Sequence, residues 1–164
     1  MSTPDRVFDA EEILRVLAEH SVDFVIIGGI AVQAHGYIRF TKDLDVIVRP
    51  TTLNLSHLSE ALLELGAELR GSGTPKLTDP NQLRRAPLTP VMTTAGPLDV
   101  VNVEHVAGAP RSYDDLRDAA LVIELSGTEV AVAGLSDLIR MKRAAGREHD
   151  LADIEALTRD PEST

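Results

Sequence analysis

The stretch GGIAVQAHGYIRFTKDLDVIV, residues 28–48, determines the fold that we expect for this chain of 164 residues. It follows a continuous apolar run, VDFVII at residues 22–27, whose length suits a buried β-strand. The double glycine ends that run and leads into a short helix at residues 30–35, which Gly36 closes. We expect the β-branched and aromatic segment YIRFTKDLDVIVRP, residues 37–50, to form a strand or one arm of a hairpin.

The rest of the chain continues this alternation of helices and strands. A capping pattern at Asp9 and Glu12 opens one helix, and Ser136 is expected to cap a late one. Residues 71–90 are rich in glycine and proline, which predicts a mobile loop that ends in a strand. Helices are expected at residues 9–20, 53–65, 112–119, 136–145 and 149–157, strands at residues 67–70 and 98–103, and a hairpin around Ser126-Gly127. This order predicts an α/β (α+β) domain with a mixed β-sheet flanked by helices.

Composition limits the class of protein. Apolar residues make up 43% of the chain and charged residues 26%, close to globular averages, which argues against disorder. The absence of cysteine excludes a disulfide scaffold, a thiolate zinc site and a cysteine nucleophile. No apolar run approaches the ~20 residues of a membrane span, and the first residues lack a signal peptide's apolar stretch. We therefore expect a cytoplasmic protein with one domain over residues 1–164, in which residues 158–164 form a frayed tail.

The chain is strongly acidic. Its 16 Lys and Arg residues against 26 Asp and Glu residues give a net charge of −10, which repels nucleic acid over most of the surface. Aromatic residues are only 3%, too few for the stacking platforms of single-strand binders. Generic DNA or RNA binding is therefore disfavoured, whereas a small polyanion could still be held through metal ions.

Three aspartates lie in strand segments where carboxylates are costly. Asp43 and Asp45 share one face of the segment 37–50, because alternate residues of a strand point to the same side. Two such carboxylates repel each other unless a cation lies between them. Asp99, in the apolar strand 98–103, carries the same cost, because we expect no side chain to offset its charge. If the two strands are neighbours, three carboxylates converge, and hard oxygen ligands of this kind suit Mg²⁺.

The double glycine gives a second indication of a phosphate-bearing ligand. Glycine lets a ligand approach the backbone closely, and amides at the start of a helix can bind a phosphate oxygen. Taken alone, Gly28-Gly29 indicates a tight strand-to-helix turn, and a D-x-D pair alone indicates a solvated strand edge. The order of the two motifs, followed by a strand aspartate, favours a functional interpretation.

Residues 28–48 resemble the core signature of the DNA polymerase beta-type nucleotidyltransferase superfamily, a Gly-Gly turn and a helix followed by a D-x-D strand. The double glycine and the late stretch LSDLIRMKRAAGREHDLADIEAL, residues 135–157, look most like the AbiEii-like toxin branch of minimal nucleotidyltransferases. The resemblance spans residues 22–49, the strand around Asp99, and residues 135–157. It implies a nucleotidyltransferase fold and Mg²⁺-dependent transfer of a nucleoside monophosphate from an NTP to an acceptor hydroxyl.

The resemblance implies a role for each matching residue. Asp43 and Asp45 match the pair that holds the metals, and Asp99 matches the third carboxylate, a metal ligand and base for the acceptor hydroxyl. Gly28 and Gly29 match the turn that takes the nucleotide's triphosphate. Many relatives have a serine beside or just after the glycine pair, where this chain has isoleucine, which leaves phosphate binding to backbone amides.

Basic residues near these motifs are candidates for nucleotide contacts. Lys142, Arg147 and Asp150 match a cluster that lies beside the nucleotide in relatives, although a solvated helix face with an Arg–Asp ion pair is an equally good interpretation. Arg39 and Lys42 flank the carboxylates, where they could meet phosphates or balance charge.

Several functions stay open at this point. The acceptor could be a tRNA end, a protein side chain or a small molecule such as an aminoglycoside or a lincosamide, and the net charge of −10 counts against tRNA. The toxin branch would add an antitoxin protein as partner. A non-catalytic or antitoxin-like regulator would keep the same fold, but the intact Asp43, Asp45 and Asp99 count against it. A glycosyltransferase with a metal-binding D-x-D is disfavoured by the chain's small size and its glycine turn.

Overall fold

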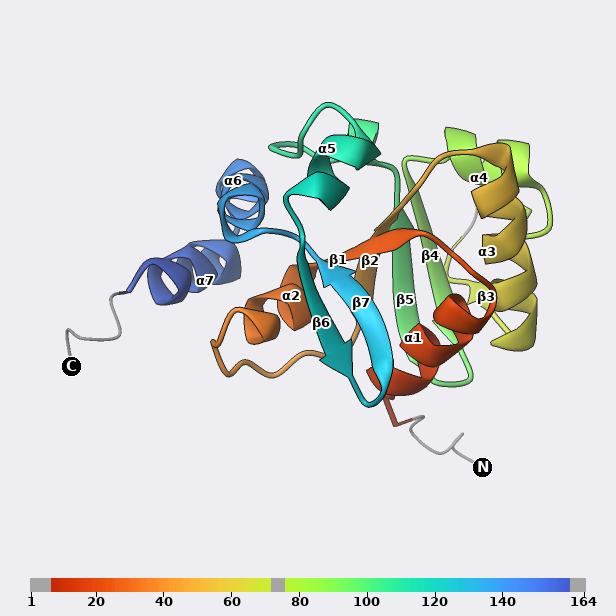
Figure 1. Cartoon of the computed structure of the whole chain (residues 1–164), viewed down its shortest axis with the longest axis horizontal. Coiled ribbons are helices and arrows are strands. Elements are labelled where there is room, and N and C mark those ends of the chain that lie inside the picture. Colours follow the sequence, from red (N-terminus) through yellow and green to blue (C-terminus); the bar gives the residue numbers. More distant parts are fainter. Residues whose placement is uncertain (1–6, 72–75, 160–164) are drawn as a thin grey trace.

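Seven strands within residues 7–71 and 76–159, the part of the chain that the computed structural model describes, form one mixed β-sheet (Figure 1). Their order across the sheet is β3-β4-β5-β2-β1-β7-β6. The strands are β1 (Phe24–Ile27), β2 (Leu44–Val48), β3 (Glu68–Leu69), β4 (Leu88–Thr93), β5 (Gly96–Val101), β6 (Leu121–Leu125) and β7 (Thr128–Val132). The prediction of a mixed sheet flanked by helices is confirmed.

Two groups of helices lie on either side of the sheet as Figure 1 shows it. The helices α1, α3 and α4 pack together at one side, α2, α6 and α7 pack together at the other, and α5 lies above the sheet in this view. The helices are α1 (Ala10–Glu19), α2 (Gly28–Ala34), α3 (Thr52–Glu64), α4 (Pro80–Arg85), α5 (Tyr113–Asp118), α6 (Leu135–Ala145) and α7 (Glu148–Thr158), with a 3-10 turn at Val103–His105.

Strand β2 has the position that matters most for the site. It runs antiparallel to β1, with Ile27 opposite Asp45, and parallel to β5, with Asp45 opposite Asp99. Val46 and Ile47 are fully buried, so both faces of this strand pack into the core. Because a fully buried aliphatic side chain contributes about 1.5–3 kcal/mol to folding, the strand that carries the carboxylates is firmly anchored.

The helix α1 shows how local sequence and core packing agree. Asp9 accepts a hydrogen bond from the backbone N–H of Glu12, as the capping pattern predicts. Ile13, Leu14 and Leu17 then bury one side of the helix in the core. The helices predicted at residues 9–20, 53–65, 112–119 and 149–157 and the hairpin around Ser126-Gly127 are confirmed in the same way.

The strand predicted over residues 37–50 is much shorter in the structure. Only Leu44–Val48 pair as a strand. The reason is that β1 turns into α2 directly after Ile27, which lies opposite Asp45, so β1 offers no partner to the residues before Asp45. Residues 37–43 instead form an irregular segment that leads up to the sheet.

The prediction that Ser136 caps the late helix is wrong. Helix α6 begins at Leu135, so Ser136 lies inside its first turn and Gly134 is the cap. Gly134 accepts the N–H of Leu138 through its carbonyl, and a Cβ at this glycine would collide with the Ala119 carbonyl oxygen. Close approach of two backbones therefore decides the start of this helix, and no local signal shows it.

The glycine- and proline-rich segment 71–90 is more regular than predicted over residues 76–90, whereas residues 72–75 lie outside the described residues. Its expected terminal strand is confirmed as β4, but it also contains the helix α4. Asp79 caps that helix by accepting the N–H groups of Asn81 and Gln82, and Pro80 takes the first helical position, where proline is well tolerated. The Asp-Pro pair is thus a helix-start signal that the composition of the segment obscures.

The boundaries of the domain stay a prediction. Helix α7 extends to Thr158, and residues 160–164 of the expected tail lie outside the described residues. In residues 7–71 and 76–159, no helix is long and apolar enough to cross a membrane.

Candidate metal and nucleotide site

Three carboxylates meet where β2 and β5 run side by side. Asp45 belongs to β2 and lies opposite Asp99 of β5, and Asp43 immediately precedes β2. One carboxylate oxygen of each residue lies within 4.8 Å of those of the other two, and all three side chains are partly buried. The sequence predicted that the three aspartates converge if their two strands are neighbours. The structure shows that the strands are neighbours and that the aspartates lie together.

The charge of Asp45 is the most perturbed in this cluster. Burial, followed by the negative charges of Asp43 and Asp99, raises the pKa of Asp45 to about 7, against the opposing effect of Lys142. The Asp45 carboxyl therefore keeps its proton at pH values at which an ordinary aspartate is ionised. A divalent cation would reverse this preference, because it stabilises the ionised carboxylates.

Asp99 has a cationic partner that the sequence did not reveal. The Arg70 guanidinium, at the end of β3, donates a hydrogen bond to Asp99 Oδ1 and forms an ion pair with it. The expectation that no side chain offsets the charge of Asp99 is therefore wrong. Arg70 reaches Asp99 across the sheet because β4 lies between β3 and β5, a strand order that local sequence does not encode.

The double glycine lies directly against the carboxylates, within the first turn of α2. Gly28 has a φ of +73°, and a Cβ there would collide with Asp45 Oδ2. At Gly29 a Cβ would lie 2.8 Å from Thr41 Oγ1. Both positions thus need glycine so that the helix start can approach the segment that carries the aspartates. Binding of a triphosphate by the backbone amides of Gly28 and Gly29 stays a prediction.

A buried charge network closes the other side of the site. Lys142 of α6 lies 3.2 Å from Asp150 Oδ1 and 3.1 Å from Asp153 Oδ2, and all three side chains are less than a tenth exposed. Arg39 Nη1 is 2.6 Å from the same Asp153 oxygen. Lys142 and Asp150 of the late cluster are therefore buried and do not belong to a solvated helix face, and the positive charge of Lys142 lowers the pKa of Asp45.

Arg147 differs from Lys142 in its exposure. Its side chain is 63% exposed, and its Nε donates to Asp150 Oδ2 at 2.7 Å. Burial alone would raise the pKa of Asp150, but hydrogen bonds from Arg147 and Lys142 hold it below its ordinary value, so Asp150 stays ionised. The expected Arg–Asp ion pair is confirmed, and Arg147 is an exposed cation at the edge of the site.

The site residues line one pocket of about 420 Å³. Of the residues predicted from sequence, the pocket is lined by Gly28, Gly29, Arg39, Asp43, Asp45, Asp99, Lys142 and Arg147. Lys42 is not among them, because its side chain is exposed and its Nζ lies 5.9 Å from the centre of the Phe40 ring. The nucleotide-binding role of Lys42 stays a prediction that this geometry does not favour.

Sequence reasoning missed three residues around the pocket. Arg70 carries no local signal, since one arginine before a glycine is common in loops. Thr41 lines the pocket and donates to the Asp43 carbonyl at 3.2 Å. Asp153 could have been found, because Asp150 and Asp153 are three residues apart and so share one helix face.

A family model built from known proteins matches residues 5–158 of the chain. Its description is nucleotidyltransferase of unknown function (DUF6036). The match spans the glycine turn, the three aspartates and the late helices. No curated protein matches the sequence.

Solved structures share the fold at low sequence identity. The antibiotic-resistance factor ANT(2″)-Ia, in a solution structure, is 14% identical, with a TM-score of 0.60 over 90% of this chain and 79% of its own. The lincosamide antibiotic adenylyltransferase LnuA, bound to lincomycin, is 14% identical, with a TM-score of 0.59 over 93% of this chain and 98% of its own. An antigenic nucleotidyltransferase-like protein from Paracoccidioides brasiliensis is 16% identical, with a TM-score of 0.56 over 92% and 77%. Identities at this level show a shared fold alone.

Proposed function

The chain belongs to the family described as nucleotidyltransferases of unknown function (DUF6036), and we propose that it transfers a nucleoside monophosphate from an NTP to an acceptor hydroxyl. One observation carries this proposal: Asp43, Asp45 and Asp99 meet against the glycine turn in a pocket of about 420 Å³. That volume lies in the range of sites for small ligands.

The three aspartates are the residues that would hold a divalent cation, and Mg²⁺ is the cation that we propose. Their oxygens lie within 4.8 Å of one another and form the hard donor set that Mg²⁺ prefers. The raised pKa of Asp45 supports this fit, because it reflects burial of the carboxyl beside the negative charges of Asp43 and Asp99, which Lys142 does not fully offset. When bound, Mg²⁺ would neutralise charge on the phosphates and lower the pKa of the attacking hydroxyl.

The proposed reaction forms one bond and breaks one. The acceptor oxygen bonds to the α-phosphorus of the NTP, and the bond from that phosphorus to the bridging oxygen of the β-phosphate breaks, so that pyrophosphate leaves. We assign Asp99 to take the proton of the acceptor hydroxyl, with the Arg70 guanidinium orienting its carboxylate. Asp43 and Asp45 are the residues that would hold the cation beside the phosphates.

The cations around the pocket have different parts in this proposal. Lys142 is held between Asp150 and Asp153, so it contributes a fixed positive potential beside the carboxylates. Arg147 is largely exposed and can turn toward the triphosphate at the cost of its pair with Asp150. Arg39 is tied to Asp153, and we assign it to hold the segment before β2 in place.

A small molecule is the acceptor class that we favour. The chain covers 98% of the length of LnuA, a lincosamide antibiotic adenylyltransferase, so a chain of this size is long enough for such a reaction. The net charge of −10 disfavours a tRNA acceptor. A hydroxyl of a small molecule, or of a protein, does not meet this electrostatic obstacle.

A transfer assay tests this function. Purified protein is incubated with Mg²⁺, each of the four NTPs labelled on the α-phosphate, and a panel of hydroxylated acceptors that includes lincosamides, aminoglycosides and a cell extract. We expect pyrophosphate release together with label on an acceptor. Metal-dependent NTP binding without label transfer or pyrophosphate release under any of these conditions would contradict the proposal and favour a regulatory protein with the same fold.

A further inference from the structure

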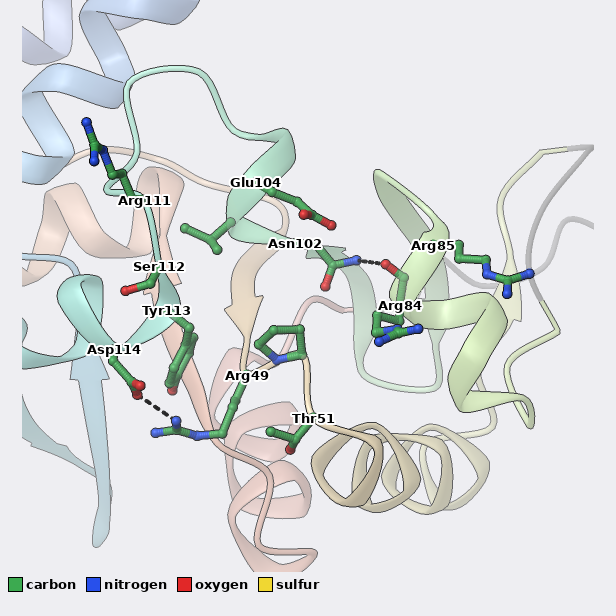
Figure 2. Close-up of a pocket in the computed structure, with 12 residues that line it drawn as sticks. Arg49, Thr51, Arg84, Arg85, Asn102, Glu104, Arg111, Ser112, Tyr113 and Asp114 are labelled. Carbon is green, nitrogen blue, oxygen red and sulfur yellow. Dashed lines mark hydrogen bonds and ion pairs between the residues drawn. The ribbon is translucent and has the colours of Figure 1, made fainter.

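Figure 2 shows a second cavity. It is lined by Arg49 and Asn102, which directly follow β2 and β5, and by none of the three aspartates. Its volume is about 710 Å³, larger than that of the pocket with the three aspartates. Arg49 directly follows β2 and is four residues beyond Asp45, about 13 Å along a strand that rises ~3.3 Å per residue. A ligand centred here therefore occupies a site of its own.

The charged lining of this cavity is mainly basic, in contrast to the chain as a whole. It consists of Arg49, Arg84, Arg85, Arg111, Glu104 and Asp114. Figure 2 shows Arg85 and Arg111 extending away from the cavity at its two ends, whereas Arg84 lies between Asn102 and Thr51. In the part of the chain that the structure describes, Arg84 has no ion-pair partner, so its charge is available to an anion.

Arg49 is held rigidly beside this free arginine. Its Nη1 donates to Asp114 at 2.6 Å and its Nε donates to Asp23 at 3.0 Å. The guanidinium also lies 4.6 Å from the centre of the Tyr113 ring. Arg49 thus forms a fixed wall, and Arg84 is the cation that can move to a ligand.

A buried amide gives an independent sign of a ligand. Asn102 is only 4% exposed, and its Nδ2 donates to the carbonyl oxygens of Leu83, Arg84 and Ala86 at 3.2, 3.0 and 2.9 Å. These bonds fix which side of the amide carries the oxygen, and in the described residues Asn102 Oδ1 has no hydrogen-bond partner. Buried acceptors without a donor are rare in native proteins.

Two hydroxyl groups add donors to the same cavity. Thr51 accepts the N–H of Asn54 at 3.2 Å as the cap of α3, and Ser112 accepts the N–H of Asp115 at 3.1 Å as the cap of α5. Each hydroxyl accepts in these bonds, so its own proton remains to be donated to a ligand.

We propose that this cavity binds a small phosphomonoester that carries hydroxyl groups. The phosphate would bind Arg84 and the Thr51 hydroxyl, and a hydroxyl of the same ligand would donate to Asn102 Oδ1. A phosphate suits this arrangement because its several oxygens accept bonds from a guanidinium and a hydroxyl on different sides. The cavity volume lies within the range of small-molecule sites.

Ribose 5-phosphate is the probe for this proposal, titrated into the full-length protein in EDTA and followed by NMR. Without metal, NTP or a transfer assay, the result does not depend on the proposed reaction. We expect amide shifts at residues 49–51, 84 and 102–104, weaker binding of inorganic phosphate, and no binding of ribose. Shifts confined to the pocket with Asp43, Asp45 and Asp99, or inorganic phosphate binding as tightly as ribose 5-phosphate, would overturn the proposal.

Arg84→Gln gives the matched variant, since Arg84 is exposed and its loss leaves the Asn102 bonds to the backbone intact. We expect at least tenfold weaker binding of ribose 5-phosphate. Arg143→Gln, the same change at an exposed position on α6 outside the cavity, should bind as the wild type does. Equal binding by Arg84→Gln, or binding of a polyglutamate peptide in place of ribose 5-phosphate, would show that the cavity is not a phosphomonoester site.

Discussion

The two pockets at the two ends of β2 are built in opposite ways. The first, the carboxylate pocket, contains Asp43, Asp45 and Asp99. These residues lie on or beside neighbouring strands, and their oxygens lie within 4.8 Å of one another. The second, the arginine cavity, is the cavity lined by Arg49, Arg84, Arg85 and Arg111. Its residues come from loops and helix ends, and their long side chains lie at an exposed rim. Like charges are concentrated in the first pocket, and cations are spread out in the second.

This difference shows where the protein accepts electrostatic cost. Partial burial of Asp45, together with the negative charges of Asp43 and Asp99 beside it, raises the pKa of Asp45 to about 7, and this cost falls on a well-packed strand. The arginine cavity stores no comparable repulsion, because Arg49 is paired with Asp23 and Asp114. Changes in the first pocket should therefore alter both chemistry and stability, and changes in the second should alter neither strongly.

The largest expected effect is the difference in transfer rate between two Asp→Asn variants, one in each pocket. Asp45→Asn should lower the rate of nucleotidyl transfer on the order of 10³-fold, because it removes a charge that the reaction needs in a preorganised place. Asp114→Asn makes the same change at the wall of the arginine cavity and should leave the rate within about twofold. Initial rates of pyrophosphate release from both variants measure the difference. Comparable losses in the two variants would show that the pockets do not differ in this way.

Glycine substitutions provide the next contrast. Gly28→Ala should destabilise the fold by about 3 kcal/mol, because Gly28 has a positive φ and its new Cβ would collide with Asp45. Gly36→Ala has the same backbone cost, at a φ of +96°, but its Cβ meets nothing within 4 Å. We expect it to cost about 1 kcal/mol. Urea unfolding of both variants tests this ranking, and equal losses would mean that Gly28 is needed only for its backbone conformation.

The raised pKa of Asp45 predicts how stability depends on pH. The folded-state pKa of about 7 exceeds the ordinary value of 3.8, so the folded protein binds this proton more tightly than the unfolded chain does. In EDTA the contribution of Asp45 to stability is therefore present at low pH and is lost as the pH rises toward 7.

Melting curves of wild type and Asp45→Asn test this sign. The variant should be the more stable by about 1–2 kcal/mol at pH 7.5, a few degrees in Tm, and this gap should shrink toward pH 4. Mg²⁺ should raise the Tm of the wild type and narrow the gap, because it binds the ionised carboxylates. A gap that does not change with pH would mean that Asp45 titrates normally.

The smallest expected effect concerns the arginines of the two regions. Arg70→Met in EDTA should cost about 1 kcal/mol, since it leaves Asp99 beside Asp45 without its cation. Adding Mg²⁺ should recover part of this loss. Arg49→Met removes pairs with the exposed Asp23 and Asp114, and its stability should not respond to Mg²⁺. A Mg²⁺ response that is the same in both variants would contradict the assignment of Arg70 to the metal site.

The carboxylate pocket was largely predictable from sequence, for a physical reason. Asp43, Asp45 and Asp99 are charged residues in strand-forming segments, so each one is conspicuous where it occurs. The first strand and the short helix after residue 22 follow from local periodicity in the same way, whereas the strand predicted over residues 37–50 is reduced to Leu44–Val48. What sequence could not give was the pairing of β2 with β5, which depends on contacts between residues far apart in the chain.

The cavity lined by Arg49, Arg84, Arg85 and Arg111 could not be predicted from the sequence. Arg49, Arg84, Asn102 and Ser112 lie on four separate segments, and none is unusual for a loop or a helix end. Arg70 was missed for the same reason. The AbiEii-like toxin role, an antitoxin partner and a cytoplasmic location rest on resemblance and composition, and they stay predictions.

The role of Asp99 tests the central claim most directly. Asp99→Asn is compared with the wild type at saturating Mg²⁺. The NTP affinity of each protein is measured by calorimetry, and label transfer is measured in a single turnover. We expect an NTP affinity within about threefold of the wild type, because Asp43 and Asp45 remain, and transfer slowed by on the order of 10³-fold. Transfer at the wild-type rate would contradict the assignment of this carboxylate to the acceptor proton, and with it the proposed use of the site.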